Sequence, residues 1–497
     1  MKFLRKTALT FFIATTVAAG SVSAAGNFTE ISSKSNVVTD KKWTITFNSN
    51  LDKDTINDEN ITVTDAKGNK VKASVSIGAT DNTVTVMPKV EGYLPGSTYY
   101  INFGTGIKSL GGKTFSSPKR MKFVTTGKFS DASTYEGIPN IVQAKMEYEP
   151  ILPNQKQTFH LKSSSSEQVQ YRIFASKYVY KFDKYEPYEE ITNGYVSAQD
   201  GKITTDKLFE AGENGEKYKI LIYVKRANKQ GAHVDENTDY DNYYIDYLRC
   251  VNSVDKSIFT DLNLNFTFNE ALDKQNNTKV SVTDEGPTSW MGASANQIKY
   301  YMNPSNFTDE YGKYMFLKLN YIDDSITEDD LNKILKGKGV LEGKGKAFLE
   351  GAKENNINPA YLVSHALLET ASGTSKLATG IEVDGKEGKK KVYNTYGIKA
   401  FDDDPNKHGS EYAYEQKWFT VEEAITGGAK YIAEKYVNNP TVKRDTLYKM
   451  RWNPSTPGSY QYATDIGWAY KQVIKIKELM DQCENPTLKF EFPVFKK

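Results

Sequence analysis

The sequence predicts a multidomain protein in which two all-β domains precede an α-rich α+β domain. At 497 residues the chain is too long for a single hydrophobic core. In its N-terminal half, short runs alternate apolar and polar residues with the period of a β-strand, and turn residues separate them. From Ser253 onward the pattern becomes mixed and then helical. We therefore expect β-rich domains over 27–127 and 135–252, and the α-rich domain over 253–497 with its core at about 300–480.

A targeting signal is expected at residues 1–24. Three cations stand among the first six residues, and the apolar run 8–20 and the small residues Val22-Ser23-Ala24 follow. The apolar run is short and interrupted by threonines, which argues against a membrane anchor. We expect a mature chain that begins near Ala25, is secreted and has no membrane partner after cleavage of the signal.

The composition limits the partners of the chain. Its net charge is only +2, so bulk charge predicts no nucleic-acid partner. Cys250 and Cys483 are its two cysteines, and they can pair only if the fold brings them together. An exported chain with so few cysteines fits a Gram-positive bacterium. No cluster of Cys or His has the spacing of metal ligands, so we expect no metal, and we expect a monomer.

Residues 27–127 are expected to form a small β-sandwich, with alternating runs at 43–47, 61–63 and 83–86. The phrases F-N-S-N-L-D-K-D-T-I (47–56), P-G-S-T-Y-Y-I (95–101) and M-K-F-V-T-T (121–126) resemble a bacterial Ig-like domain of surface proteins. This resemblance implies a spacer or a module that adheres to the cell wall.

Residues 135–252 are expected to form a second, Ig-like sandwich with tyrosines on one face. Strands are predicted at 169–174, 218–224 and 243–247, separated by Gly-containing turns. Tyrosines on a sheet face can bind carbohydrate, or they can pack inside the protein because Tyr is a good strand residue. The sequence leaves both interpretations open.

The stretch Asn358–Lys376 predicts a buried helix that carries a single acid. Asn358 is a good N-cap, Pro359 suits the first turn, and the residues that follow are apolar on nearly all sides. Glu369 stands at the C-terminal end, and Ser372-Gly373 supplies the stop. Burial and the negative end of the helix dipole both disfavour a carboxylate anion there, which suits a general acid. The alternative is an ordinary exposed residue at a helix end.

The sequence around this helix resembles the glucosaminidase domain of bacterial autolysins, glycoside hydrolase family 73. The matching motifs cover roughly 200 residues in order: Y-Y-M-N-P-S-N-F (300–307), S-H-A-L-L-E-T-A-S-G-T-S-K-L-A (364–378), V-Y-N-T-Y-G-I-K-A (392–400), G-G-A-K-Y-I (427–432), D-T-L-Y-K-M-R-W-N-P (445–454) and Q-Y-A-T-D-I-G-W-A (461–469). The resemblance implies a lysozyme-like fold and a Glu369 that protonates a β-1,4 bond after N-acetylglucosamine in peptidoglycan. Such chemistry needs no cofactor.

The second catalytic group is less defined, because the usual scheme uses two carboxylates. The charged segment 380–393 is expected to form a hairpin at the rim of the site, and its Glu382 is the first candidate. An aspartate from 402–404 and Asp465 are alternatives, although Asp465 also looks like a helix cap. In a third scheme the 2-acetamido oxygen of the substrate is the nucleophile, and tyrosines orient it; the candidates are Tyr393, Tyr396 and Tyr462.

Further residues of the motifs are candidates for contacts with the substrate. His365 lies one helical turn before Glu369, where it can line the site or support the acid from the core. Asn394 is expected to contact sugar or to shape its loop. Phe401, Trp418 and Trp452 are candidates for stacking, but R-W-N-P can equally hold the fold together.

The leading hypothesis is a secreted, cell-wall-associated autolysin whose partner is the peptidoglycan glycan, with the β domains available to bind other wall polymers. One alternative is a lytic transglycosylase that cleaves after N-acetylmuramic acid. The other is a non-catalytic wall-binding or adhesion protein, which an intact Glu369 and its motifs disfavour.

Overall fold

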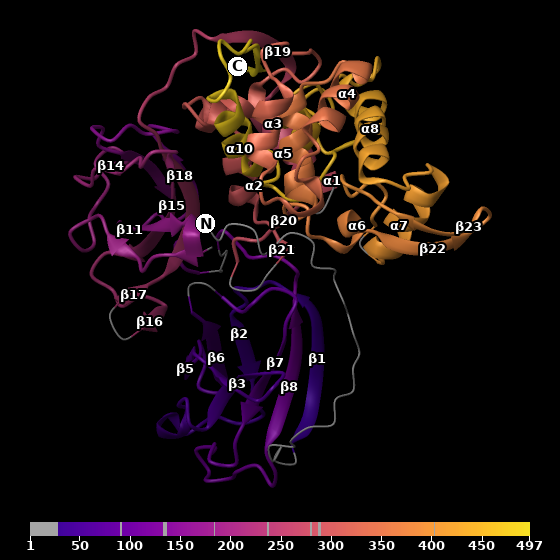
Figure 1. Cartoon of the computed structure of the whole chain (residues 1–497). Coiled ribbons are helices and arrows are strands. Elements are labelled where there is room, and N and C mark those ends of the chain that lie inside the picture. Colours follow the sequence, from indigo (N-terminus) through magenta and orange to yellow (C-terminus); the bar gives the residue numbers. More distant parts are fainter. Residues whose placement is uncertain are drawn as a thin grey trace.

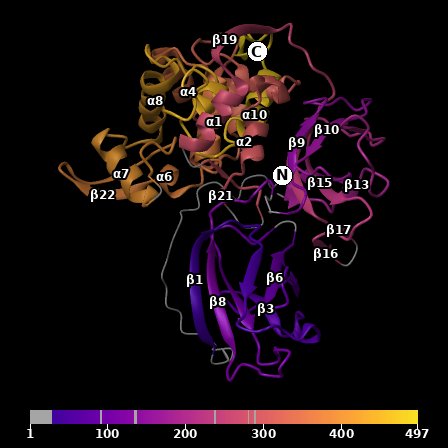
Figure 2. The ribbon, with the colours of Figure 1, turned by 180° about the vertical axis from the view of Figure 1, so that it is seen from behind.

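The computed structural model has three parts, which Figures 1 and 2 show from opposite sides. An N-terminal sandwich lies at the bottom of Figure 1, a second β unit lies at the left, and a helical domain lies at the upper right. The predicted targeting signal falls outside the described residues. Those residues are 28–89, 92–132, 137–182, 184–235, 238–278, 281–286, 290–401 and 403–497.

The N-terminal sandwich pairs two sheets. The first has the order β1-β8-β7-β3-β4 and the second the order β2-β6-β5. Its strands are β1 (Thr29–Val37), β2 (Trp43–Thr46), β3 (Ile61–Asp65), β4 (Lys70–Val71), β5 (Ala73–Ile77), β6 (Thr83–Pro88), β7 (Thr98–Phe103) and β8 (Lys119–Thr125). Alternate residues such as Val63, Ile101 and Phe123 fill one core between the sheets. The strands predicted at 43–47, 61–63 and 83–86 are confirmed.

The second β unit also has two sheets around a core of its own. One has the order β14-β10-β9, and the other has the order β12-β11-β15-β18 with β13 beside β11. The strands are β9 (Ile141–Met146), β10 (Thr158–Ser163), β11 (Val169–Val179), β12 (Lys184–Tyr185), β13 (Glu189–Glu190), β14 (Lys202–Thr204), β15 (Glu216–Arg226) and β18 (Asn242–Cys250). Cys250 is buried in this unit, and Cys483 is buried in the helical domain. The two cysteines do not pair, and both thiols are free.

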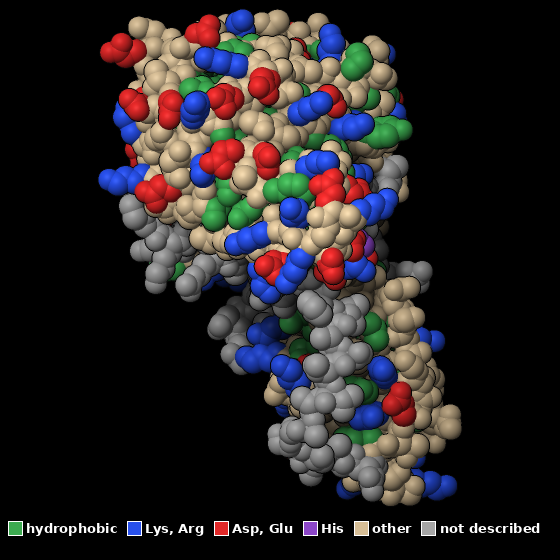
Figure 3. All heavy atoms as spheres, turned by 45° about the vertical axis from the view of Figure 1, so that its right-hand side comes forward, with side chains coloured by type: hydrophobic (Ala, Val, Ile, Leu, Met, Phe, Trp, Pro, Cys, Tyr) green, Lys and Arg blue, Asp and Glu red, His purple; other side chains and the backbone are tan. Residues whose placement is uncertain are grey.

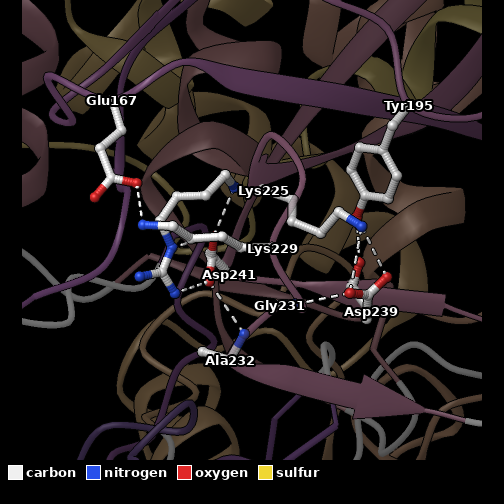
Figure 4. Close-up of polar contacts among 9 residues, drawn as sticks. Glu167, Tyr195, Lys225, Lys229, Gly231, Ala232, Asp239 and Asp241 are labelled. Atoms are coloured by element: carbon white, nitrogen blue, oxygen red, sulfur yellow. Dashed lines mark hydrogen bonds and ion pairs between the residues drawn. The ribbon is translucent and has the colours of Figure 1, made fainter.

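A small hairpin, β16 (His233–Asp235) and β17 (Thr238–Tyr240), contacts β5 of the N-terminal sandwich. Charged contacts secure the turn that leads to it (Figure 4). Asp241 pairs with Arg226 at 2.9 Å and accepts the backbone N–H of Ala232. Asp239 pairs with Lys225 at 3.1 Å. These contacts fix the hairpin to the end of β15.

The tyrosine face of the second unit is a packing surface. Tyr223, Tyr243 and Tyr247 are buried in the same core as Tyr300 and Phe307 of the helical domain. The other face of β15, with Ile220 and Ile222, belongs to the unit's own core. Of the two interpretations of these tyrosines, the structure therefore supports packing.

Buried charges cross this junction. Lys217 pairs with Glu285, which also accepts the hydroxyl of Tyr301. Arg249 pairs with Asp309 at 3.2 Å. Because a buried charge is costly unless it is paired, these contacts fix the orientation of the two parts.

The helical domain surrounds α5. Its helices are α1 (Phe268–Thr278), α2 (Ala295–Met302), α3 (Glu328–Leu335), α4 (Gly345–Asn355), α5 (Pro359–Glu369), α6 (Lys376–Thr379), α7 (Pro405–Glu415), α8 (Val421–Ile432), α9 (Leu447–Trp452) and α10 (Tyr470–Met480). Helix α5 packs against α3, α4 and α10. Strand pairs β19 (Phe259–Thr267) with β24 (Phe490–Lys496), β20 (Val282–Thr283) with β21 (Met291–Gly292), and β22 (Ile381–Gly385) with β23 (Gly388–Val392) complete it.

Asp465, which looks like a helix cap in the sequence, lies in a turn. Helix α10 begins at Tyr470, and Asp465 accepts the N–H of Gly467. Helix α8 ends at Ile432 and continues as one π turn over 433–437. The hairpin predicted over 380–393 is confirmed.

The surface of the helical domain mixes both signs of charge, as Figure 3 shows, in keeping with the small net charge. Within the described ranges, no helix combines the length and apolarity that a membrane crossing requires.

Candidate active site

Helix α5 is buried along most of its length and carries the carboxyl of Glu369 at its C-terminal end. Asn358 accepts the N–H groups of Ala360 and Tyr361, and every residue from Pro359 to Leu367 is buried. The helix ends at Glu369, and the chain then turns through three left-handed residues, Ala371, Ser372 and Gly373, with φ of 49°, 59° and 79°. The predicted cap and stop are both confirmed. Two non-glycine residues in this region represent backbone strain directly beside the acid.

Glu369 is partly open to solvent and is held from one side. Its side chain is 26% exposed. The indole N–H of Trp468 donates to Oε1 at 3.2 Å, and Nε2 of His365 lies 3.6 Å from the same oxygen. The second oxygen faces Gly397, where a Cβ would lie only 3.1 Å from it. The carboxyl is thus oriented by an indole and a close backbone, and its side chain remains partly exposed.

Gly397 has two reasons to be glycine. Its φ is +62°, a conformation that costs an L-residue roughly 1–2 kcal/mol. A side chain there would also crowd Glu369. Sequence reasoning did not select Gly397, although glycine inside the motif T-Y-G-I was a usable signal.

Aromatic rings enclose the inner side of the acid. His365 is fully buried, its Nδ1 lies 2.8 Å from the hydroxyl of Tyr361, and its ring meets those of Tyr396, Tyr462 and Trp468 edge to face. Tyr462 donates its hydroxyl to the carbonyl of Tyr396 at 3.3 Å. Burial and the charge of Glu369 raise the pKa of Tyr462 well above its usual value, so this hydroxyl remains a donor at physiological pH.

Comparisons with known proteins identify this domain. Residues 345–481 match the glucosaminidase family model, described as mannosyl-glycoprotein endo-β-N-acetylglucosaminidase, and residues 21–125 match the bacterial Ig-like domain. The C-terminal part is a glucosaminidase domain. It is therefore a glycoside hydrolase domain, and the N-terminal sandwich is a bacterial Ig-like domain.

Relatives support this assignment over part of their length. A β-N-acetylglucosaminidase of Bacillus subtilis (strain 168) is 48% identical over 209 residues, which cover 42% of this chain and 23% of that protein. The bifunctional autolysin of Staphylococcus aureus (strain COL) is 43% identical over 215 residues, which cover 42% of this chain and 17% of the autolysin. The chain thus matches less than a quarter of each relative.

Among solved structures, S. aureus autolysin E in complex with a muropeptide is 36% identical. That match covers 47% of this chain and 98% of autolysin E, with a TM-score of 0.41. The lysozyme-like fold and the Ig-like character of the second β unit stay predictions.

The first candidate for a second catalytic carboxylate lies on the rim hairpin with a partner of its own. Glu382 is exposed on the β22–β23 hairpin and pairs with Lys389. The hairpin projects outward at the edge of the domain (Figures 1 and 2).

The other acidic candidates have partners of their own. Asp465 pairs with Lys471 at 2.6 Å. Asp403 lies 3.1 Å from His408, and Asp404 caps α7. Asp402 falls outside the described residues.

Some of the residues predicted to contact the substrate are exposed, and others are buried. Phe401 is 54% exposed, and Tyr393 is partly buried. Asn394 is buried, and its amide donates to the carbonyls of Ile398 and Gly409, which is the loop-shaping alternative. Tyr396 and His365 are buried behind Glu369. Trp418 and Trp452 are also buried, so neither offers a face for stacking.

Two of the quoted motifs support the site through packing and hydrogen bonds. In G-G-A-K-Y-I, a Cβ on Gly428 would lie 2.2 Å from the ring of Tyr396, so the glycine lets that ring pack on α8. In R-W-N-P, the guanidinium of Arg451 donates to the carbonyls of Thr464 and Asp465 and so holds the loop that carries Tyr462.

Proposed function

We propose that the chain is a secreted peptidoglycan hydrolase that cleaves the β-1,4 bond after N-acetylglucosamine, with Glu369 as the general acid. The observation that carries this proposal is the setting of Glu369. It is a partly exposed carboxyl at the end of a buried helix, it receives the indole N–H of Trp468, and it lies inside the glucosaminidase domain.

The first step is transfer of a proton from Glu369 to the glycosidic oxygen while the bond from that oxygen to the anomeric carbon breaks. The carbonyl oxygen of the 2-acetamido group on the same sugar attacks the anomeric carbon and forms a cyclic oxazolinium ion. The Glu369 carboxylate then takes a proton from the water that opens this ring. The acetamido group is restored, and the new reducing end keeps its configuration.

Two features support this substrate-assisted scheme over a second catalytic carboxylate. The described candidates Glu382, Asp403 and Asp465 each pair with a basic side chain, and Asp404 caps α7. In addition, the hydroxyl of Tyr462 donates its proton to the carbonyl of Tyr396, and we propose that its oxygen accepts the N–H of the acetamido group and so orients that group. Tyr393 and Phe401 are the proposed contacts with neighbouring sugars.

The β domains would place the enzyme at the wall. The Ig-like domain and the second β unit are proposed to bind wall polymers or to space the catalytic domain from them. The mature enzyme would act as a monomer outside the cell. Wall turnover and the separation of daughter cells are the processes that this activity would serve.

Product analysis tests the reaction. Purified peptidoglycan is digested with the mature protein, reduced with borohydride, and its fragments are identified by mass spectrometry. Reduced N-acetylglucosamine ends are expected. Anhydro-muramic ends would instead identify a lytic transglycosylase, and wall binding without cleavage would identify an adhesion protein.

A further inference from the structure

Arg444 is a buried cation without a counterion. The residue is 5% exposed, its Nε has no hydrogen-bond acceptor, and no carboxylate of the described chain forms an ion pair with it. In the described ranges, the other two buried arginines donate hydrogen bonds, although Nη1 of Arg249 also has no acceptor. Arg249 pairs with Asp309, and Arg451 donates to two carbonyls and a side-chain amide. Burying a charge without a counterion raises the free energy of the folded protein. We therefore infer that an anion outside the chain pairs with Arg444.

Arg444 lies beside the aromatic rings that enclose the inner side of Glu369. Its guanidinium is 5.0 Å from the ring centre of Tyr436. That ring is 4.9 Å from Tyr462, and Tyr462 is 5.0 Å from Trp468, the residue that donates to Glu369. Two tyrosine rings thus separate the unpaired cation from the indole that holds the acid.

An exposed tyrosine stands next to this cation. Tyr460 is 75% exposed, more than any other large apolar side chain in the described part of the chain, and its ring centre is 5.8 Å from the guanidinium. Its φ is +50°, which is uncommon for a residue other than glycine. The side-chain amide of Asn453 donates to the carbonyl of Ser459 and holds the turn. A strained backbone that presents a bare ring suggests a contact surface for a ligand.

We propose that Arg444 and Tyr460 form an anion-binding subsite for a carboxylate on the lactyl-peptide arm of the glycan. This inference rests on the proposed function, because peptidoglycan differs from a neutral N-acetylglucosamine polymer by that arm. A guanidinium binds a carboxylate through two parallel hydrogen bonds, whereas neutral sugar hydroxyls do not require a buried cation. The tyrosine ring would pack on the adjoining peptide or sugar.

The carboxylate can belong to the peptide stem or, where no stem is attached, to the lactyl group itself. Three ligands separate these sources. One is a disaccharide-peptide with free carboxylates, the second is the same molecule with its carboxylates amidated, and the third is the disaccharide with the lactyl carboxylate alone.

The test measures dissociation constants for these ligands with the full mature chain carrying Glu369→Gln, so that no ligand is consumed. Adding Arg444→Gln is expected to weaken binding of the carboxylate ligand about 10- to 100-fold, the usual worth of a hydrogen-bonded charge. Binding of the amidated ligand should be unchanged. Arg444→Lys should keep part of the preference for the carboxylate. If Arg444→Gln also weakens binding of the disaccharide with the lactyl carboxylate alone, the lactyl group is the source of the bound carboxylate.

Lys443→Gln is the matched control. Lys443 is exposed and adjacent, so this change removes the same charge without touching the subsite. Thermal unfolding should show that Arg444→Gln remains folded, since the change removes no ion pair and only the contacts of the guanidinium with Tyr436 and Tyr460. Equal weakening for the free and amidated ligands, or none for either, would overturn the subsite. Absence of glycan cleavage by the unmodified protein would instead overturn the proposed function.

Discussion

The acid of this site is defined by contacts that reach it from distant parts of the chain. Trp468 donates to one oxygen of Glu369, and Gly397 limits the space around the other. Both contacts restrict the carboxyl to a narrow range of orientations. A general acid is effective only when its proton points at the leaving oxygen. With Glu369 in the role proposed for it, we expect these two residues to affect turnover.

Gly397→Ala is expected to lower kcat at least about tenfold, since the new methyl group would crowd Glu369 Oε2 and strain the backbone. The measurement is the rate of peptidoglycan hydrolysis. Gly388→Ala is the control, because Gly388 also has a positive φ, +82°, but has open space around it at the hairpin tip. Equal rates for the two variants would contradict this role of Gly397.

Among the elements, α8 shows how a helix can be shaped by its neighbours. Glycine inside a helix is normally unfavourable by about 1 kcal/mol relative to alanine. Here Gly427 and Gly428 face the rings of Trp418 and Tyr396, which leave no space for a methyl group. The helix therefore gives up intrinsic stability so that the ring behind Glu369 can pack closely.

The substitution Gly428→Ala distinguishes helix propensity from close packing, because the two change the free energy of unfolding in opposite directions. Helix propensity alone predicts a gain of about 1 kcal/mol in the free energy of unfolding, whereas overpacking predicts a loss of about 1–3 kcal/mol. We expect a loss, measured by chemical denaturation. Lys430→Ala on the exposed side of α8 should change stability little. A stabilised Gly428→Ala would show that Tyr396 can move aside.

At the scale of the whole molecule, the second β unit is continuous with the helical domain. Its tyrosines and the buried pairs of Lys217 and Arg249 belong to the shared junction. The Ig-like domain is contacted by the small β16–β17 hairpin, in which His233 stacks on Tyr240 with ring centres 4.6 Å apart. His233 is thus a titratable ring within the hairpin that makes this contact.

Burial lowers the pKa of His233 to about 4, with Lys42 contributing in the same direction and Asp241 opposing it. Below its ordinary value of 6.5, the unfolded chain binds a proton that the folded chain does not. The free energy of unfolding should therefore fall by about 3 kcal/mol between pH 6.5 and 4. His233→Phe keeps a stacked ring without the titration, so its melting temperature should fall less on acidification. Parallel pH profiles for both proteins would refute the assignment.

The sequence predicted what depends on neighbours in the chain. The cap at Asn358, the stop after Glu369, the strands of the Ig-like domain and the hairpin over 380–393 all follow from local patterns. It did not single out Trp468 or Gly397 as neighbours of Glu369, because tertiary packing creates those contacts. It also left the tyrosine face undecided, since only the partner surface determines whether a sheet face is open.

We propose that Glu369, and no other carboxylate, donates the proton. The rate of peptidoglycan hydrolysis by Glu369→Gln and by Glu382→Gln, each compared with the unmodified protein, tests this role most directly. We expect a loss of about 10²–10⁴-fold for Glu369→Gln. For Glu382→Gln we expect a rate within about twofold, since an exposed ion pair contributes little. A comparable loss in Glu382→Gln, or full activity in Glu369→Gln, would show that Glu369 does not have this role.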